Sequence, residues 1–268
     1  MNISRVNPLY LALLILLICS TSFIACKDKA GQKEKPEDKV SDRAHKVMSK
    51  HDKNDQHSEK GQEETHEGHE SMKTLPVEKR IVFMSGHVEA GLALYRAGAP
   101  DQAAQHLLHP VSETHKDERA GIDALGFTPK VFQAVSKALD EGKPASEIEP
   151  MLKQAESNIA LMQKNAGGSP AELIEYLMET VNEEYAVGVK EGVITDPGEY
   201  QDAYGFSVVA LSIAQRIKDE KSKDVIGHLE TLVKLWPPEG PLAKSTPKAV
   251  AEVVAQTAKV VKSISFLR

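Results

Sequence analysis

The chain has 268 residues, of which 41 % are hydrophobic, so part of it can bury a core. Aromatic residues make up only 5 %, while Ala, Leu, Val, Glu and Lys are abundant, which favours helices over a β-sandwich or barrel. The net charge of −6 and the pI near 6.0 do not indicate the basic surface that binds nucleic acid. We therefore exclude nucleic-acid binding and expect no nucleic-acid partner.

The N-terminus has the layout of a secretory signal. Arg5 precedes the apolar run LYLALLILLI, and the smaller, more polar CSTSFIAC follows it. We therefore expect residues 1–25 to be a signal peptide and the protein to be exported. An uncleaved membrane helix is the alternative, because the apolar stretch is near the lower length limit for spanning a bilayer.

The segment FIAC, which ends at Cys26, resembles the lipobox of bacterial lipoproteins. The resemblance implies that Cys26 is lipidated and becomes the first residue of the mature protein; Phe23 stands where that family usually has Leu. It places the protein in the bacterial cell envelope, facing the periplasm, and Lys27 after the cysteine favours the outer membrane. Several acyl chains, palmitate among them, would anchor it firmly to the membrane.

Cysteine usage limits the chemistry of the mature chain. Cys19 would leave with the signal and Cys26 would be modified, so no cysteine remains for a disulfide, a thiol nucleophile or a thiolate metal site. Imidazole and carboxylate are then the available metal ligands.

Residues 26–75 have the composition of a disordered, lipid-anchored linker. From Lys27 to Leu75 both charge signs are dense and Phe, Trp and Tyr are absent, so the segment cannot build a core. Half of the ten histidines lie there: His45, His51, His57, His66 and His69. They could load metal weakly, or the segment could be a solubilising spacer.

Residues 76–268 carry long apolar-periodic runs separated by Gly and Pro, which predicts an all-α bundle of about eight helices, arranged for instance as two four-helix layers. The expected helices span 77–97, 101–118, 128–141, 145–165, 169–190, 197–219, 222–236 and 247–265. Three of them have cap signals followed by Pro, at Ser169, Asp196 and Thr246. No alternating stretch indicates a strand.

The stretch HLLHPVSETH carries the first candidate metal site. His106, His109 and Glu113 are three, four and seven residues apart, so they share one helix face. His87, on the preceding helix, lies near an apolar stripe and could face the second helix. We therefore predict a metal cluster of His87, His109 and Glu113, with His106 beside it. The alternative is that His87 and His109 are hydrogen-bonded core residues while His106 faces solvent.

The region from Glu183 to Phe206 carries the second candidate site. Glu199 and Asp202 stand at i and i+3 on one helix, and Glu184 lies near the end of the previous helix. Such carboxylates could chelate a cation or could simply face water.

The same region, EEYAVGVKEGVITDPGEYQDAYGF, resembles the periplasmic helical segment of bacterial high-affinity iron permeases. An acidic residue with Tyr, then A-V, a Gly-containing turn, and E-Y followed by an acidic residue and Phe carry the resemblance. In general layout the chain is also similar to imelysin-like iron-associated lipoproteins. These resemblances imply an extracytoplasmic helical domain involved in iron or copper supply. No multi-span permease follows in this chain, and Asp202 stands where that family has Glu.

No catalytic arrangement is evident in the sequence, since H-E-x-x-H and Gly-rich phosphate loops are absent and Ser85 beside His87 lacks a strand-turn-helix context. We therefore expect no enzyme activity. The favoured function is binding, buffering or delivery of iron or copper, with a metal-uptake permease or an oxidase as partner. The alternative is an envelope scaffold or protein-interaction lipoprotein whose histidines are incidental.

Overall fold

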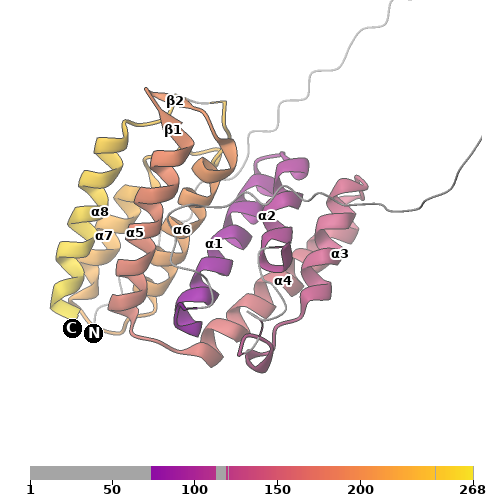
Figure 1. The fold of residues 1–268 in the computed structure, drawn as a ribbon, viewed down its shortest axis with the longest axis horizontal. Helices are drawn as coiled ribbons and strands as arrows, with labels where there is room; N and C mark the ends of the chain where they lie inside the picture. The colour runs from indigo at the N-terminus through magenta and orange to yellow at the C-terminus, as the bar shows by residue number, and fades with distance from the viewer. Residues whose placement is uncertain (1–73, 113–118, 120, 245, 268) are drawn as a thin grey trace, which may run out of the picture. The chain divides into compact units, whose positions relative to one another are not determined.

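Eight α-helices make up most of the described chain (Figure 1), which confirms the predicted all-α class. The computed structural model describes residues 74–112, 119, 121–244 and 246–267. The helices are α1 (Val77–Arg96), α2 (Pro100–Ser112), α3 (Pro129–Asp140), α4 (Ala145–Ala166), α5 (Pro170–Gly188), α6 (Pro197–Gln215), α7 (Ser222–Val233) and α8 (Val250–Ile264). Short 3₁₀ turns occupy Asp123–Leu125 and Ser265–Leu267.

Local sequence signals account for most helix boundaries. Asp196 caps α6 as predicted, because its carboxylate accepts from the backbone N–H of Gly198 at 3.0 Å and of Glu199 at 3.4 Å. Ser169 is the N-cap residue of α5, but its side chain makes no capping hydrogen bond, so the predicted side-chain cap is wrong.

The predicted start of α8 at Thr246 and Pro247 is also wrong, because this helix begins at Val250. A tertiary contact lies at the predicted first turn. The Tyr185 hydroxyl donates to the Lys248 carbonyl at 2.9 Å. In a helix that began at Pro247, this carbonyl would accept from the N–H of residue 252, which here donates to the Ala249 carbonyl at 2.8 Å.

A two-residue hairpin that the sequence did not predict joins α5 to α6. Strand β1 (Val189–Lys190) pairs antiparallel with β2 (Val193–Ile194). The turn between them has positive φ at both central residues, 53° at Glu191 and 77° at Gly192, which suits the twist of a tight hairpin. Strands of two residues are too short to show the alternation by which a sequence reveals them.

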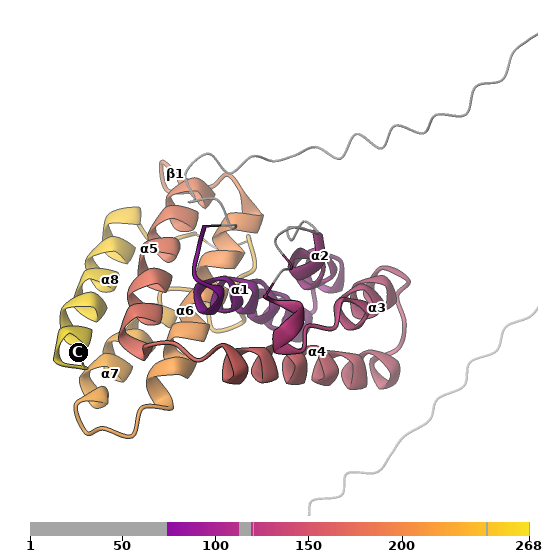
Figure 2. The ribbon, with the colours of Figure 1, turned by 60° about the horizontal axis from the view of Figure 1, so that its bottom comes forward.

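The helices form two bundles with separate hydrophobic cores. One core is built by α1–α4, and the other by α5–α8 together with Leu75 and part of α1. Helix α1 contacts α2 and α4 on one side and α6 on the other, and both views show it at the junction of the bundles (Figures 1 and 2).

Glycines allow α1 and α6 to approach closely at this junction. A Cβ atom added to Gly205 would lie 2.0 Å from the Gly86 carbonyl oxygen, and one added to Gly86 would lie 2.0 Å from the Phe206 ring. Neither position tolerates a side chain at this spacing. The contact places the residue after Gly86, which is His87, beside the first turns of α6.

Candidate metal centre

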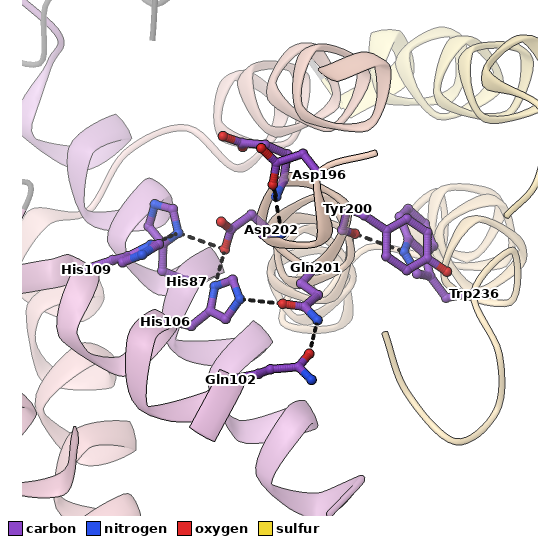
Figure 3. A network of polar contacts seen from close by, with 11 residues as sticks. His87, Gln102, His106, His109, Asp196, Tyr200, Gln201, Asp202 and Trp236 are labelled. Carbon is purple, nitrogen blue, oxygen red and sulfur yellow. Dashed lines mark hydrogen bonds and ion pairs between the residues drawn. The ribbon is translucent and has the colours of Figure 1, made fainter. Parts of the chain in front are cut away.

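Four side chains from three helices converge between the bundles (Figure 3). His87 comes from α1, His106 and His109 from α2, and Asp202 from α6; one ligand atom of each lies within 4.8 Å of the others. The Nδ1 atoms of His87 and His106 lie 2.8 and 2.9 Å from Asp202 Oδ1. His109 Nδ1 lies 3.1 Å from His87 Nδ1. Two of the three imidazoles thus present Nδ1 to one carboxylate oxygen, and the third presents its Nδ1 to His87.

The histidine side of the cluster follows from helix periodicity and one further glycine. His106 and His109, three residues apart, share the face of α2 that is turned toward α1. A Cβ on Gly91 would lie 2.8 Å from the Leu107 side chain, so glycine lets α2 pack closely on α1. Pro110 lies inside α2, directly after His109, and is buried.

The first turns of α6 are held in place by the second core. The indole Nε1 of Trp236 donates to the Tyr200 carbonyl at 3.1 Å, and its ring packs against Tyr185, Tyr200 and Tyr204. Figure 3 shows this contact on the side of α6 away from the histidines. Asp202, two residues later, is therefore carried by a helix that is packed on both sides.

Burial and charge shape the chemistry of the cluster. His87, His106 and Asp202 are 4 %, 2 % and 3 % exposed, while His109 is half-buried and forms the outer edge. Burial alone would raise the pKa of Asp202, but the facing His87 and His106 rings outweigh it and hold this pKa below its ordinary value. Burial would lower the pKa of His106, but Asp202 and a hydrogen bond to Gln201 raise it overall.

This donor set suits a transition metal. Neutral imidazole and carboxylate bind zinc, iron, copper(II) and manganese, whereas calcium and magnesium prefer oxygen ligands alone. Around a tetrahedral ion with metal–nitrogen distances of about 2.0–2.1 Å, neighbouring donors would stand about 3.3 Å apart. Three separations between donor atoms here are 2.8, 2.9 and 3.1 Å, so small side-chain movements would admit an ion.

The structure brings together only some of the residues that the sequence singled out. His87, His106 and His109 meet, and His106 is buried rather than solvent-facing. Glu113 lies outside the described residues, as do Cys26 and the histidines of the linker.

Asp202, predicted to form a second site with Glu184 and Glu199, lies with the histidines instead. Glu184 is buried on α5 and Glu199 lies one turn nearer the start of α6; among the described residues neither joins a metal-ligand group. The reason is the crossing of α1 and α6, which turns Asp202 toward His87.

Two glutamines that the sequence did not suggest complete the network. Gln201 Oε1 accepts from His106 Nε2 at 2.8 Å, and Gln201 Nε2 donates to Gln102 Oε1. The only available signal was spacing: Gln102 and His106 are four residues apart and share a face of α2. Which glutamine of α6 they meet depends on tertiary packing.

The fold and the cluster define a class: an all-helical, two-bundle protein with a buried carboxylate–histidine group that could hold a metal ion. Residues 162–265 match the family model described as the iron permease-associated 4-helix bundle domain. The match spans α5–α8 and the end of α4, so it includes Asp202 and excludes the three histidines. No curated protein and no solved structure matches the chain. Among the described helices, none is long and apolar enough to cross a membrane.

Proposed function

We propose that this protein binds a divalent transition metal, iron or copper in particular, through His87, His106, His109 and Asp202, and buffers it or delivers it to an uptake system. The observation that carries the proposal is the convergence of three buried or half-buried imidazoles on one ionised carboxylate. Burying such polar groups together is costly unless they satisfy one another or hold an ion.

The position of the cluster supports reversible binding. Three of its members are buried and His109 is half-buried, so His109 is the ligand that an incoming ion would meet first. Buried ligands retain an ion against solvent, and a half-buried ligand such as His109 lets the ion pass to a partner. Buffering and delivery require a site that both retains and releases its ion, whereas turnover of a substrate does not. We therefore propose a non-enzymatic role.

The cellular setting is part of the same proposal. The match of residues 162–265 to an iron permease-associated domain supports a role beside an iron-uptake permease in the envelope. The signal-like N-terminus and the lipobox-like FIAC support lipidation at Cys26 and a periplasm-facing anchor. An oxidase is the other candidate partner.

A scaffold role has less support. Docking faces need contiguous exposed apolar side chains. Among the described residues, the large hydrophobic side chains that are exposed belong to four different elements: Leu161, Val187, Val193 and Val254.

Metal titration of the full chain tests the proposal. We expect one tight equivalent of Fe²⁺ (without oxygen), Cu²⁺ or Zn²⁺. Loss of a ligand in His109→Ala or Asp202→Asn should lower the metal affinity by more than about 100-fold, because loss of even a residue that only hydrogen-bonds a ligand lowers affinity by about 10–100-fold. Competition with a chromophoric chelator measures the affinity.

His228→Ala is the matched control, because His228 is a half-buried histidine on α7, outside the cluster. It should leave the tight site unchanged. The linker histidines are present in every variant, so metal that they bind adds the same background to each measurement. Equal affinities for the unchanged protein, His109→Ala and His228→Ala would refute the proposal.

A further inference from the structure

A hydrogen-bond chain runs behind His106, on the side away from the cluster (Figure 3). His106 Nε2 lies 2.8 Å from Gln201 Oε1, and the amide nitrogen of Gln201 donates to Gln102 Oε1. His106 and Gln201 are each 2 % exposed, so water has little access to compete for these bonds. Gln201 of α6 thus bridges two residues one turn apart on α2.

This series of hydrogen bonds has a direction, which determines the atom that donates and the atom that accepts in each bond. A glutamine amide offers one acceptor oxygen and one NH₂ donor. The NH₂ of Gln201 is used by Gln102, so its oxygen faces His106 and only an N–H at Nε2 can satisfy it. With the hydrogen on Nε2, Nδ1 is the His106 nitrogen that remains to bind an ion, and Nδ1 is the atom that faces Asp202 at 2.9 Å.

We infer that Gln201 is a positioning residue for the metal centre: it holds the His106 ring so that Nδ1 is presented to the ion. The inference rests on the proposed function, because it assigns a role within that same site. If the ring turned over, it would move the hydrogen-bearing nitrogen into the cluster and would leave the buried Gln201 oxygen without its donor. Partners of this kind commonly orient metal-binding histidines.

Two substitutions separate positioning from packing. Gln201→Met keeps the length of the side chain but removes the acceptor, so we expect Zn²⁺ affinity to fall about 10–100-fold. Gln201→Glu keeps an acceptor toward Nε2, so it should restore affinity to near the unchanged value. Gln105→Met is the control, since Gln105 is an exposed glutamine of α2, the helix that carries His106. Zn²⁺ affinity is measured in the full chain by competition with a chelator.

Nitrogen NMR of the His106 ring provides a readout that packing alone would not change. In the zinc-bound unchanged protein we expect zinc on Nδ1 and hydrogen on Nε2. In Gln201→Met we expect this single arrangement to be lost, while the melting temperature in chelator reports any loss of folding separately.

Three results would overturn the inference. The first is zinc on Nε2 of His106 in the unchanged protein. The second is unchanged affinity in Gln201→Met. The third is equal loss of affinity in Gln201→Met and Gln201→Glu, together with a matching fall in melting temperature. Each of these three results leaves the proposed function standing as long as His109→Ala abolishes tight zinc binding. Absence of tight zinc binding in the unchanged protein would refute the proposed function and this inference together.

Discussion

At the scale of single residues, Asp202 is the centre of the site. One of its oxygens lies within 2.9 Å of two imidazole nitrogens, one from each of two helices. A buried carboxylate without such partners would be protonated, because burial disfavours its charged form. The facing histidines therefore hold the pKa of Asp202 low and keep it ionised in the metal-free protein.

The metal-free protein should be most stable between about pH 4 and pH 6.5. The pKa of Asp202 is held below its ordinary 3.8, so its contribution is present above that pH and is lost as pH falls. The pKa of His106 is raised above its ordinary 6.5, so its contribution is present below that pH and is lost as pH rises through the higher value. Thermal unfolding in chelator, measured below, within and above this pH range, shows both losses of stability.

Asp202→Asn is the variant that checks this pH dependence. It removes the titrating carboxylate and the charge that raises the pKa of His106, so its stability should vary less with pH and should be lower by about 1–3 kcal/mol near pH 5.5. A stability maximum above pH 7, or the same profile in both proteins, would contradict the assignment.

At the scale of helices, the contact between α1 and α6 decides whether the site forms. His87 and Asp202 come from different bundles, and their side chains meet because Gly86 and Gly205 allow the two backbones to approach. A side chain at either position would push the two helices apart and would increase the distance between His87 and Asp202.

We expect Gly205→Ala to destabilise the fold by about 1–3 kcal/mol, as overpacking usually does. Its new methyl group would lie 2.0 Å from the Gly86 carbonyl and 2.9 Å from the Ala90 nitrogen, both of them backbone atoms. Metal affinity should fall as well, because His87 would move away from Asp202. Denaturant unfolding and metal titration measure the two effects.

Gly227→Ala is the matched control. Gly227 lies within α7, and a Cβ there would meet nothing within 4 Å. This change should stabilise the protein by up to about 1 kcal/mol, the helix-propensity difference, with no effect on metal binding. A Gly205→Ala protein as stable as Gly227→Ala would show that the helices do not need this close contact.

At the scale of the whole described unit, the cluster joins the two bundles. Three of the candidate ligands come from α1 and α2, and the fourth comes from α6, within the part that matches the iron permease-associated domain. A bound ion would therefore link the two cores, and its binding free energy would stabilise both.

Zinc at about 100 times its dissociation constant should add about 2.7 kcal/mol to the free energy of unfolding. Amide hydrogen exchange should slow in α1, α2 and α6 together, because the ion bridges them. His109→Ala should abolish both effects. Slower exchange in α1 and α2 alone would mean that Asp202 is not a ligand.

The sequence by itself determined the helical class, most helix boundaries and the pairing of His106 with His109 on one face. These features depend on local causes: a Pro or Gly ends a helix, Asp196 caps one, and a spacing of three residues aligns two side chains. The local predictions failed at the start of α8, where the Tyr185 hydroxyl contacts the Lys248 carbonyl, at the side-chain cap of Ser169 and at the hairpin between α5 and α6.

Only the tertiary structure decided which carboxylate joins the histidines. Asp202 lies 115 residues after His87 and 96 after His106, and no periodicity extends over such distances. The packing of α6 against α1, made close by glycines, selects Asp202 and brings Gln201 behind His106. Spacing along one helix tells which side chains share a face, but the helix that packs against that face is set by the whole core.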